Sequence, residues 1–104
     1  MTVMPPFEIA VDPDGDRVVV VPQGEIDLST VPVLRRRLDE AAGSGAKQVV
    51  LDLRGVSFLD SSGLKLILDQ LDRDVGFALI AGPESVHRVF EITGLHERIP
   101  FVME

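Results

Sequence analysis

Residues 57–64 have the sequence Ser57-Phe-Leu-Asp-Ser-Ser-Gly-Leu64, which leads out of a predicted buried strand and into a predicted helix. The strand is the apolar stretch at residues 48–53, and residues 54–59 are predicted to be a connection. Asp60 is a favourable N-cap residue, and apolar residues follow it at helical spacing. Ligands of open α/β sheets bind beyond the carboxyl ends of the strands. This loop is therefore the first candidate for a functional site.

The predicted elements on either side of this loop complete an α/β fold. Residues 7–11 alternate in polarity, residues 12–16 form a turn and residues 17–21 are a valine-rich strand, so this pair predicts a hairpin. Four consecutive valines indicate a strand that is covered on both faces. The remaining predicted elements are a helix from Val31 to Ala42 capped by Ser29 or Thr30, a strand at residues 77–81, a helix from Pro83 to Gly94 and a short strand at residues 99–102.

The order of the predicted elements is β-β-α-β-α-β-α-β. Helices that separate strands favour parallel pairing with right-handed crossovers. We therefore predict one domain over residues 1–104, in which an N-terminal β-hairpin strand is followed by a mostly parallel sheet with helices packed on it.

The small polar residues at the start of the second predicted helix suit a phosphate group. Asp60, Ser61, Ser62 and Gly63 leave backbone N–H groups and hydroxyls accessible, and the positive end of a helix stabilises a phosphate on Ser61 or Ser62. Asp and Ser are also common N-cap residues with no other role. The sequence of this loop leaves both interpretations open.

The segment Gly24-Glu-Ile-Asp27 follows the valine strand and precedes the first predicted helix. Segments that follow neighbouring parallel strands lie at the same end of the sheet. We therefore expect Asp27 to lie close to Ser61. An ordinary turn or capping role for Asp27 is equally compatible with its position.

Composition restricts the classes of function. The chain has 104 residues, a net charge of −7, no cysteine and only two histidines, which disfavours disulfides and clusters of Cys or His metal ligands. The negative charge opposes binding to nucleic acids or anionic membranes, and it predicts partners with basic surfaces. The apolar runs are too short for a membrane helix and the N-terminus lacks signal-peptide features, so we expect a cytoplasmic protein. We predict no cofactor, metal or catalytic residue.

Three motifs together resemble the STAS domain, and in particular the bacterial anti-sigma factor antagonists. They are Gly24-Glu-Ile-Asp27, Phe58-Leu-Asp-Ser-Ser-Gly-Leu64 and Val89-Phe-Glu-Ile-Thr-Gly-Leu95, in the same order as in that family. The resemblance extends over nearly the whole chain and implies a β-α superhelix. Pro22 departs from the family pattern, because it stands where an apolar strand residue is usual and removes one backbone donor.

The resemblance implies a regulatory cycle. In the family the first serine of Asp-Ser-Ser-Gly is phosphorylated, which corresponds to Ser61, and the acid of the first motif lies beside it, which corresponds to Asp27. Asp27, Asp60, Ser62, Gly63 and Leu64 would form the switch loop and the partner-binding surface. The implied partners are an anti-sigma factor that is also a serine kinase using ATP and magnesium, and a serine phosphatase. Binding of the unphosphorylated form releases a sigma factor, and phosphorylation prevents binding.

Several alternatives remain beside this expectation. A STAS domain can also serve as a subunit of a lipid-transport or signalling complex without a phosphorylation cycle. An esterase-like Ser61 lacks the first glycine of Gly-x-Ser-x-Gly, and Gly43-Ser-Gly-Ala-Lys47 lacks the spacing of a nucleotide-binding loop. The basic run Arg35-Arg36-Arg37 is best interpreted as a solvated helix face, although it could contact a partner.

Overall fold

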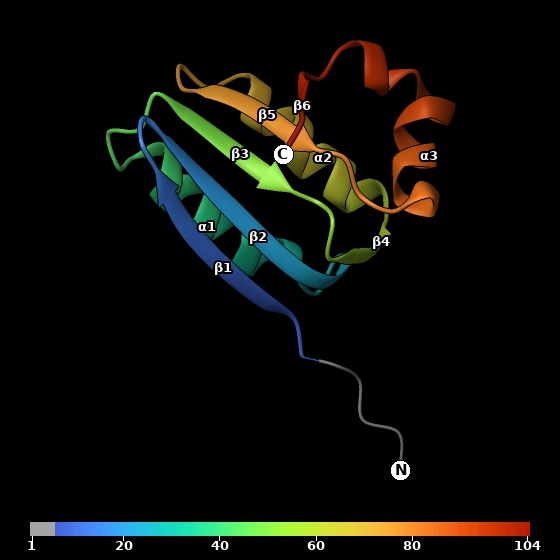
Figure 1. Cartoon of the computed structure of the whole chain (residues 1–104). Helices are drawn as coiled ribbons and strands as arrows, with labels where there is room; N and C mark the ends of the chain where they lie inside the picture. The colour runs from blue at the N-terminus through green and yellow to red at the C-terminus, as the bar shows by residue number, and fades with distance from the viewer. Residues whose placement is uncertain (1–5) are drawn as a thin grey trace.

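The computed structural model describes residues 6–104 of the chain. These residues form one six-stranded sheet with helices packed against it (Figure 1), so the predicted α/β class is confirmed. Five strands lie in the order β1-β2-β3-β5-β6, and β4 pairs with β2 outside this row. The elements are β1 (Glu8–Asp14), β2 (Arg17–Ile26), α1 (Val31–Ala42), β3 (Gln48–Asp52), β4 (Val56–Leu59), α2 (Ser61–Leu71), β5 (Gly76–Ile80), α3 (Glu84–Thr93), the 3₁₀ helix η1 (Leu95–Glu97) and β6 (Phe101–Val102).

Strands β1 and β2 form the predicted antiparallel hairpin. Its turn is tighter than predicted, because Asp14 already pairs with Arg17 and residues 12 and 13 belong to β1. Gly15 has a φ of 64°, a left-handed conformation that glycine adopts without steric cost. A tight turn of this kind lets the strands continue almost to the tip of the hairpin.

Strand β2 extends well beyond the valine run and changes its parallel partner on the way. Its first half pairs with β3 up to Val20, and its second half pairs with β4 from Gly24 onward. Pro22 lies between these two stretches, so its missing N–H falls where β2 has no parallel neighbour. Gly24 has a φ of 117°, and the pairing register shifts between Gly24 and Glu25. The predicted strand end at Val21 was therefore wrong.

Strand β4 was missed in the sequence, where residues 54–59 were predicted to be a connection. Val56 and Leu59 are buried, and Leu59 pairs with Ile26 of β2. The two middle residues, Ser57 and Phe58, are both exposed, so the segment lacks the alternating pattern of a half-buried strand. This short strand nevertheless carries the chain to the start of α2.

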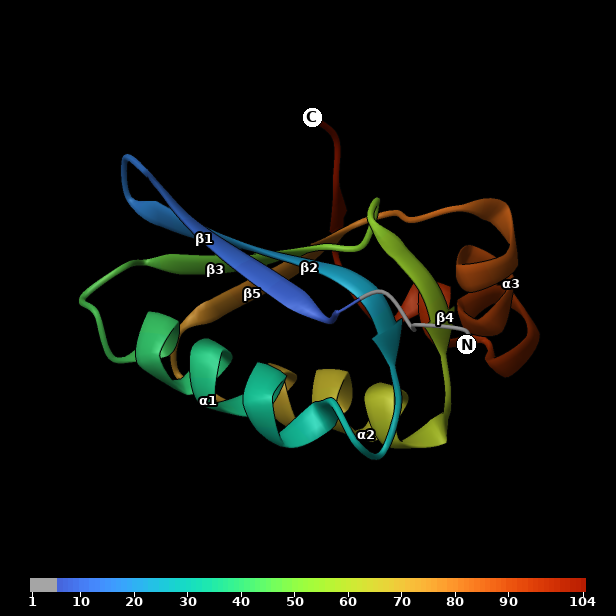
Figure 2. The ribbon, with the colours of Figure 1, turned by 90° about the horizontal axis from the view of Figure 1, so that it is seen from below.

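Helices α1 and α2 lie side by side on one face of the sheet (Figure 2). Arg35 of α1 pairs with Asp69 of α2 at 3.1 Å, and a second ion pair joins Asp39 to Arg73. Beneath them lies the main core, whose fully buried side chains come from both helices and from the sheet. They include Val20, Leu34, Leu38, Leu51, Leu66, Ile67 and Leu79.

The opposite face of the sheet is buried in a different way. Val19, Val50 and Ile80 form a second buried cluster there, with Val21 and Val102 packed against it. Both faces of the valine strand are thus covered, as its composition predicts, but α1 and α2 cover only one of them. The C-terminal strand β6 packs against the second cluster, and the chain ends on that side in Figure 2.

Helix α3 lies at one end of the sheet, beside β4 (Figures 1 and 2). His87 of α3 packs edge to face against Phe101 of β6, with the ring centroids 5.1 Å apart. Phe90 is fully buried in the main core, and Gly94 ends the helix with a φ of 75°. Among residues 6–104, no helix has the length and apolar character needed to cross a membrane.

Candidate functional site

The segment at residues 57–64, the first candidate from the sequence, forms a tight turn between β4 and α2. Asp60 is the N-cap residue, as predicted, and its Oδ1 accepts hydrogen bonds from the N–H groups of Ser62 (2.9 Å) and Gly63 (3.1 Å). The Ser62 hydroxyl also donates to Asp60 Oδ1, at 2.5 Å. These bonds satisfy donors at the helix start that have no partner within the helix. We name residues 60–63 the Asp60 turn.

The two serines of the Asp60 turn differ in exposure and in bonding. Ser62 is half-buried and its hydroxyl is held by Asp60. Ser61 is exposed, and within residues 6–104 its hydroxyl makes no hydrogen bond. The residue-type pattern alone left open which serine would be free, and the structure gives Ser61 the accessible hydroxyl. The next predicted residue, Leu64, is half-buried and packs against the main core.

Gly63 is required by close packing. A Cβ atom at this position would lie 2.4 Å from Leu59 Cδ1 and 2.8 Å from Ile26 Cγ2. Both neighbours are buried in the core, so a Cβ at this position would require them to shift within well-packed surroundings. The absence of a side chain at Gly63 lets α2 begin directly against β2 and β4.

The segment that begins at Gly24 and contains Asp27 forms a second turn with the same bonding. Asp27 Oδ1 accepts from the Ser29 N–H (2.9 Å), the Ser29 hydroxyl (2.6 Å) and the Thr30 N–H (3.3 Å). Thr30 is the N-cap residue of α1, but its side chain makes no capping bond and instead donates to the Glu25 carbonyl at 2.8 Å. The Asp27 N–H donates to Thr30 Oγ1 at 2.9 Å. We name residues 27–30 the Asp27 turn.

The two turns lie next to each other because they leave neighbouring parallel strands. Ile26 pairs with Leu59, and the Asp60 N–H donates to the Ile26 carbonyl at 3.2 Å. The strand ends run together into α1 and α2 at the lower edge of Figure 2. The expected proximity of Asp27 to the Asp60 turn is thus present, but the neighbouring strand is β4 rather than the predicted strand at residues 48–53.

Hydrogen bonding keeps both aspartates negatively charged. The Ser29 hydroxyl, with the N–H groups of Ser29 and Thr30, holds the pKa of Asp27 below its usual value, although the nearby charge of Asp60 acts in the opposite direction. The Ser62 hydroxyl, with the N–H groups of Ser62 and Gly63, likewise holds the pKa of Asp60 below its usual value. The exposed Ser61 therefore lies in a locally negative field at neutral pH.

Exposed apolar side chains accompany the two turns. Leu28, at the tip of the Asp27 turn, is 77% exposed, and Val33 and Phe58 are about half exposed. A cavity of about 290 Å³ is lined by residues of the Asp27 turn and of the segments next to it: Phe7, Gly24, Glu25, Asp27, Ser29, Thr30 and Ser57. The sequence indicated Ser29 only as a helix cap and gave no role to Leu28. The repeated spacing Asp-x-Ser at residues 27–29 and 60–62 was a signal for two turns of the same kind, although it does not indicate the exposure of the middle residue.

The two histidines, His87 and His96, and the loop that begins at Gly43 make structural contacts. His87 packs between Phe90 and Phe101, and neither it nor His96 is hydrogen-bonded to Ser61 in residues 6–104. The loop from Gly43 ends α1, with the Ser44 hydroxyl bonded to the Ala41 carbonyl. Within the same described residues, no group of three or more His, Cys, Asp and Glu side chains could hold a metal ion.

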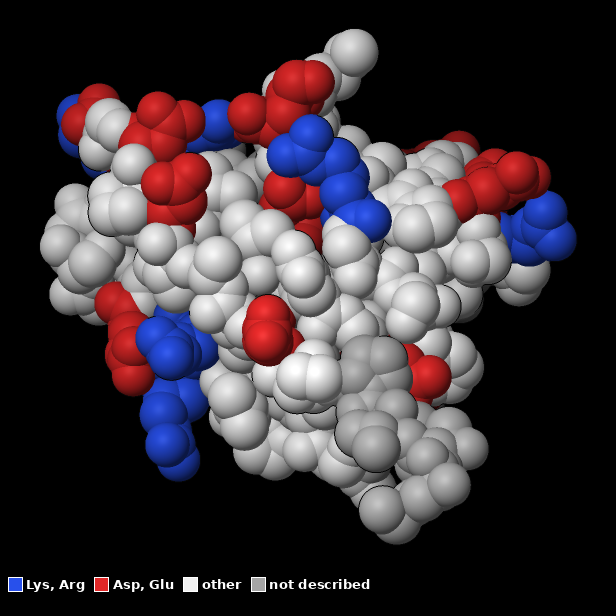
Figure 3. Space-filling model, turned by 60° about the horizontal axis from the view of Figure 1, so that its bottom comes forward, with Lys and Arg blue, Asp and Glu red and all other residues white. Residues whose placement is uncertain are grey.

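The basic run of α1 belongs to a mixed charged surface. Arg35 pairs with Asp69, while Arg36 and Arg37 are exposed. On the face drawn in Figure 3, each basic group lies beside acidic groups, and much of the area between them is uncharged. The exposure of Arg36 and Arg37 agrees with the interpretation of this run as a solvated helix face, whereas Arg35 joins α1 to α2.

Together, an N-terminal hairpin, a mostly parallel sheet and two helices on one face define a small α/β module with an exposed serine at the start of α2. Residues 8–104 match the family model described as STAS domain. The chain therefore belongs to the STAS domain family.

Relatives and solved structures agree with this assignment. The anti-sigma-B factor antagonist of Staphylococcus aureus is 33% identical over 78 residues, which are 71% of this chain and 72% of that protein. A crystal structure of an anti-sigma factor antagonist from Mycobacterium paratuberculosis superposes with a TM-score of 0.85 and 28% identity, over 95% of this chain and 89% of that one. The unphosphorylated form of the anti-sigma factor antagonist SpoIIAA shares the fold, with a TM-score of 0.74, 24% identity and coverage of 95% and 88%.

Proposed function

We propose that this chain is an anti-sigma factor antagonist controlled by phosphorylation of Ser61. In this proposal the unphosphorylated form binds an anti-sigma factor that is also a serine kinase, and this binding releases a sigma factor. Phosphorylation of Ser61 prevents binding, and a serine phosphatase restores it. The names of the relatives support the antagonist role, and the geometry of the Asp60 turn supports the choice of Ser61.

The observation that carries the proposal is the difference between the two adjacent hydroxyls. Phosphoryl transfer requires an accessible hydroxyl that can be held in line with the phosphate. Ser61 is exposed and its hydroxyl is free of hydrogen bonds within residues 6–104, whereas the Ser62 hydroxyl is bonded to Asp60. Transfer to Ser62 would break that bond, and transfer to Ser61 would not.

The charge of a phosphate explains how modification would prevent binding. A phosphoserine carries about −1.5 to −2 charges at neutral pH. Asp27 and Asp60 are already ionised there, and the helix N-terminus offsets only about 0.3–1 kcal/mol. Like charges that must be desolvated in a complex cost several kcal/mol, and about 1.4 kcal/mol changes affinity tenfold. The switch therefore needs no change of fold.

Ser61 acts in this proposal as a substrate residue of the kinase. The kinase supplies the nucleotide, the metal and the base, so the chain itself needs none of these groups. An esterase role for Ser61 would require a base within reach of its hydroxyl. Both histidines instead make contacts with α3 or β6 residues.

The test combines phosphorylation with binding. Each purified anti-sigma serine kinase of the organism that carries this chain is incubated with ATP, magnesium and the wild type, Ser61→Ala or Ser85→Ala. Ser85 is an exposed serine of α3 and serves as the matched control. Mass spectrometry should find phosphate in the wild type and in Ser85→Ala but not in Ser61→Ala. The phosphorylated wild type should bind the kinase at least about tenfold more weakly than the unmodified protein.

Two outcomes would contradict the proposal. One is an unmodified Ser61 under conditions in which the same kinases phosphorylate a known antagonist. The other is equal affinity of the phosphorylated and unmodified forms. Either result would favour a STAS subunit of a lipid-transport or signalling complex without a phosphorylation cycle.

A further inference from the structure

Leu28 occupies the same place in the Asp27 turn that Ser61 occupies in the Asp60 turn. Each residue directly follows an aspartate whose Oδ1 accepts from the N–H and the hydroxyl of the serine two positions later. The strands that lead into the turns are paired in register at Ile26 and Leu59. Neighbouring strands are about 4.8 Å apart, so the tips of the two turns are neighbours on the surface.

The exposure of Leu28 exceeds that of most large apolar side chains in the described residues. It is 77% exposed, and only Met103 (95%) is more exposed, while Ile92 is equal to Leu28. A single exposed leucine is common in folded proteins. Here, however, the equivalent position of the neighbouring turn holds a serine, so the turn geometry itself does not require an apolar residue.

Most hydrogen-bonding groups of the Asp27 turn are already used within the turn. Asp27 Oδ1 accepts three hydrogen bonds from within the turn, and the Thr30 hydroxyl is bonded to Glu25 and Asp27. The apolar contact that this turn leaves available is therefore the side chain of Leu28. The ionised carboxylate of Asp27 directly precedes Leu28 in the chain, and that of Asp60 belongs to the neighbouring turn.

We infer that Leu28 is a docking anchor that inserts into an apolar pocket with a basic rim on the anti-sigma kinase, an inference that rests on the proposed function. The apolar pocket matches the leucine, and the basic rim matches the two ionised aspartates. Insertion excludes water from the surface between the two turn tips. A phosphate on Ser61 would then have to lose its own hydration beside Leu28, which explains why modification of a neighbouring residue blocks docking.

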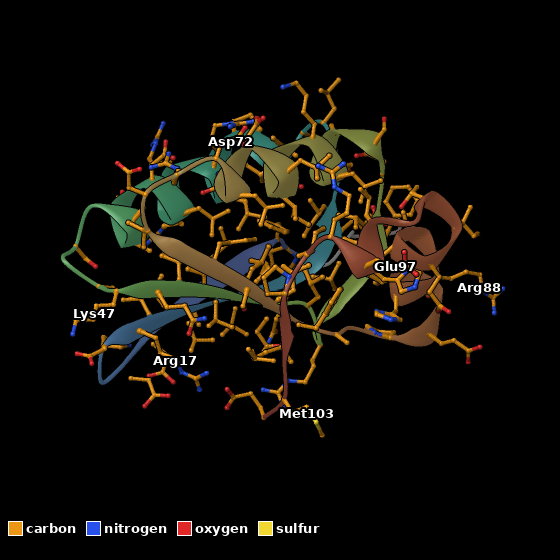
Figure 4. The ribbon with its side chains drawn as sticks, turned by 90° about the horizontal axis from the view of Figure 1, so that it is seen from above. Arg17, Lys47, Asp72, Arg88, Glu97 and Met103 are labelled. Atoms are coloured by element: carbon orange, nitrogen blue, oxygen red, sulfur yellow. The ribbon has the colours of Figure 1, made fainter. Side chains whose placement is uncertain are left out.

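The test compares Leu28→Ala with a control of similar exposure on a distant surface. Met103 follows β6 and projects from the C-terminal end of the chain (Figure 4), on the side of the sheet opposite to α1 and α2. The probe is each purified anti-sigma serine kinase of the same organism, without and with prior phosphorylation of the chain. Leu28→Ala should bind at least about fivefold more weakly than the wild type, since truncated anchor residues lose that much, and Met103→Ala should bind normally. Leu28→Asp should bind more weakly still, and both Leu28 variants should keep the wild-type melting temperature.

The possible outcomes separate this inference from the proposed function. If Leu28→Ala and Leu28→Asp bind like the wild type while phosphorylation still abolishes binding, the anchor is overturned and the switch stands. If both Leu28 variants weaken binding but phosphorylation does not, the anchor stands and the switch is overturned. If Met103→Ala weakens binding as much as Leu28→Ala, or if no kinase binds the wild type, the anchor is overturned.

Discussion

The Asp27 turn and the Asp60 turn are built in the same way and yet present different chemistry. In both, one aspartate oxygen accepts from the N–H and the hydroxyl of the serine two residues later. The Asp27 turn presents Leu28 at its tip, and the Asp60 turn presents Ser61. The bonding that shapes each turn is thus independent of the residue at its tip, and this leaves the tip free to serve recognition or modification.

The turns also differ in how closely they are fixed to the sheet. Gly63 in the Asp60 turn packs directly against Ile26 and Leu59, whereas the corresponding residue in the other turn, Thr30, has a side chain that bonds back to Glu25. Asp60 caps α2 directly, while Asp27 lies three residues before the N-cap position of α1. The Asp60 turn is therefore the more constrained one, and substitutions there should have larger effects.

The largest expected effect is that of Gly63→Ala. The added methyl would lie 2.4 Å from Leu59 Cδ1, and overpacking of a well-packed core costs about 1–3 kcal/mol. Urea unfolding monitored by circular dichroism should show a decrease of that size in the free energy of unfolding. The matched control is Gly43→Ala at the end of α1, where the nearest atom to a new Cβ is Asp39 O at 3.5 Å. It should change stability by less than about 0.5 kcal/mol, and a loss in the control as large as in Gly63→Ala would contradict this explanation.

The sequence predicted the fold and the position of the Asp60 turn because both depend on strong local signals. Long apolar runs specify the strands, and an aspartate before an amphipathic stretch specifies a helix start. The same rules missed β4, whose four residues include the exposed Ser57 and Phe58. Its strand character depends on pairing with β2, which is a contact between segments distant in the sequence.

Tertiary contacts also explain what the sequence left open at the site. Ser61 and Ser62 are the same residue type in adjacent positions, and only the helical geometry after Asp60 directs one hydroxyl to the cap and the other to solvent. The proximity of Asp27 was predicted from the order of strands, but from the wrong pair of strands. The exposure of Leu28 could not be predicted, because an apolar residue after a strand is equally compatible with burial.

A smaller effect is expected from removal of each aspartate. Asp60→Ala removes the N-cap of α2 and should lower the melting temperature by about 4–8 °C, as is usual for a domain of this size. Asp27→Ala should lower it by less, because the bonds of Thr30 to Glu25 and Asp27 still close that turn. Thermal unfolding at pH 7 measures both. An equal or larger decrease in Asp27→Ala would show that the two turns are equally constrained.

The smallest expected effect concerns the stability of the fold at acidic pH. It should differ between the wild type and variants in which Asp27 or Asp60 is replaced by asparagine. Hydrogen bonds lower the pKa of Asp27 and of Asp60 from the usual 3.8, so each ionised carboxylate stabilises the fold above about pH 4. This contribution is lost as the pH falls through the lowered pKa values, because the carboxylates must then take up protons. Asparagine can also cap, so Asp27→Asn and Asp60→Asn should change stability little at pH 7 but should lose less of it between pH 4 and pH 2. The control is Asp12→Asn on the exposed side of β1, where no hydrogen bond or ion pair to the carboxylate occurs within residues 6–104. If all three variants and the wild type lose the same stability at acidic pH, the hydrogen bonds in the two turns do not favour the ionised carboxylates of Asp27 and Asp60.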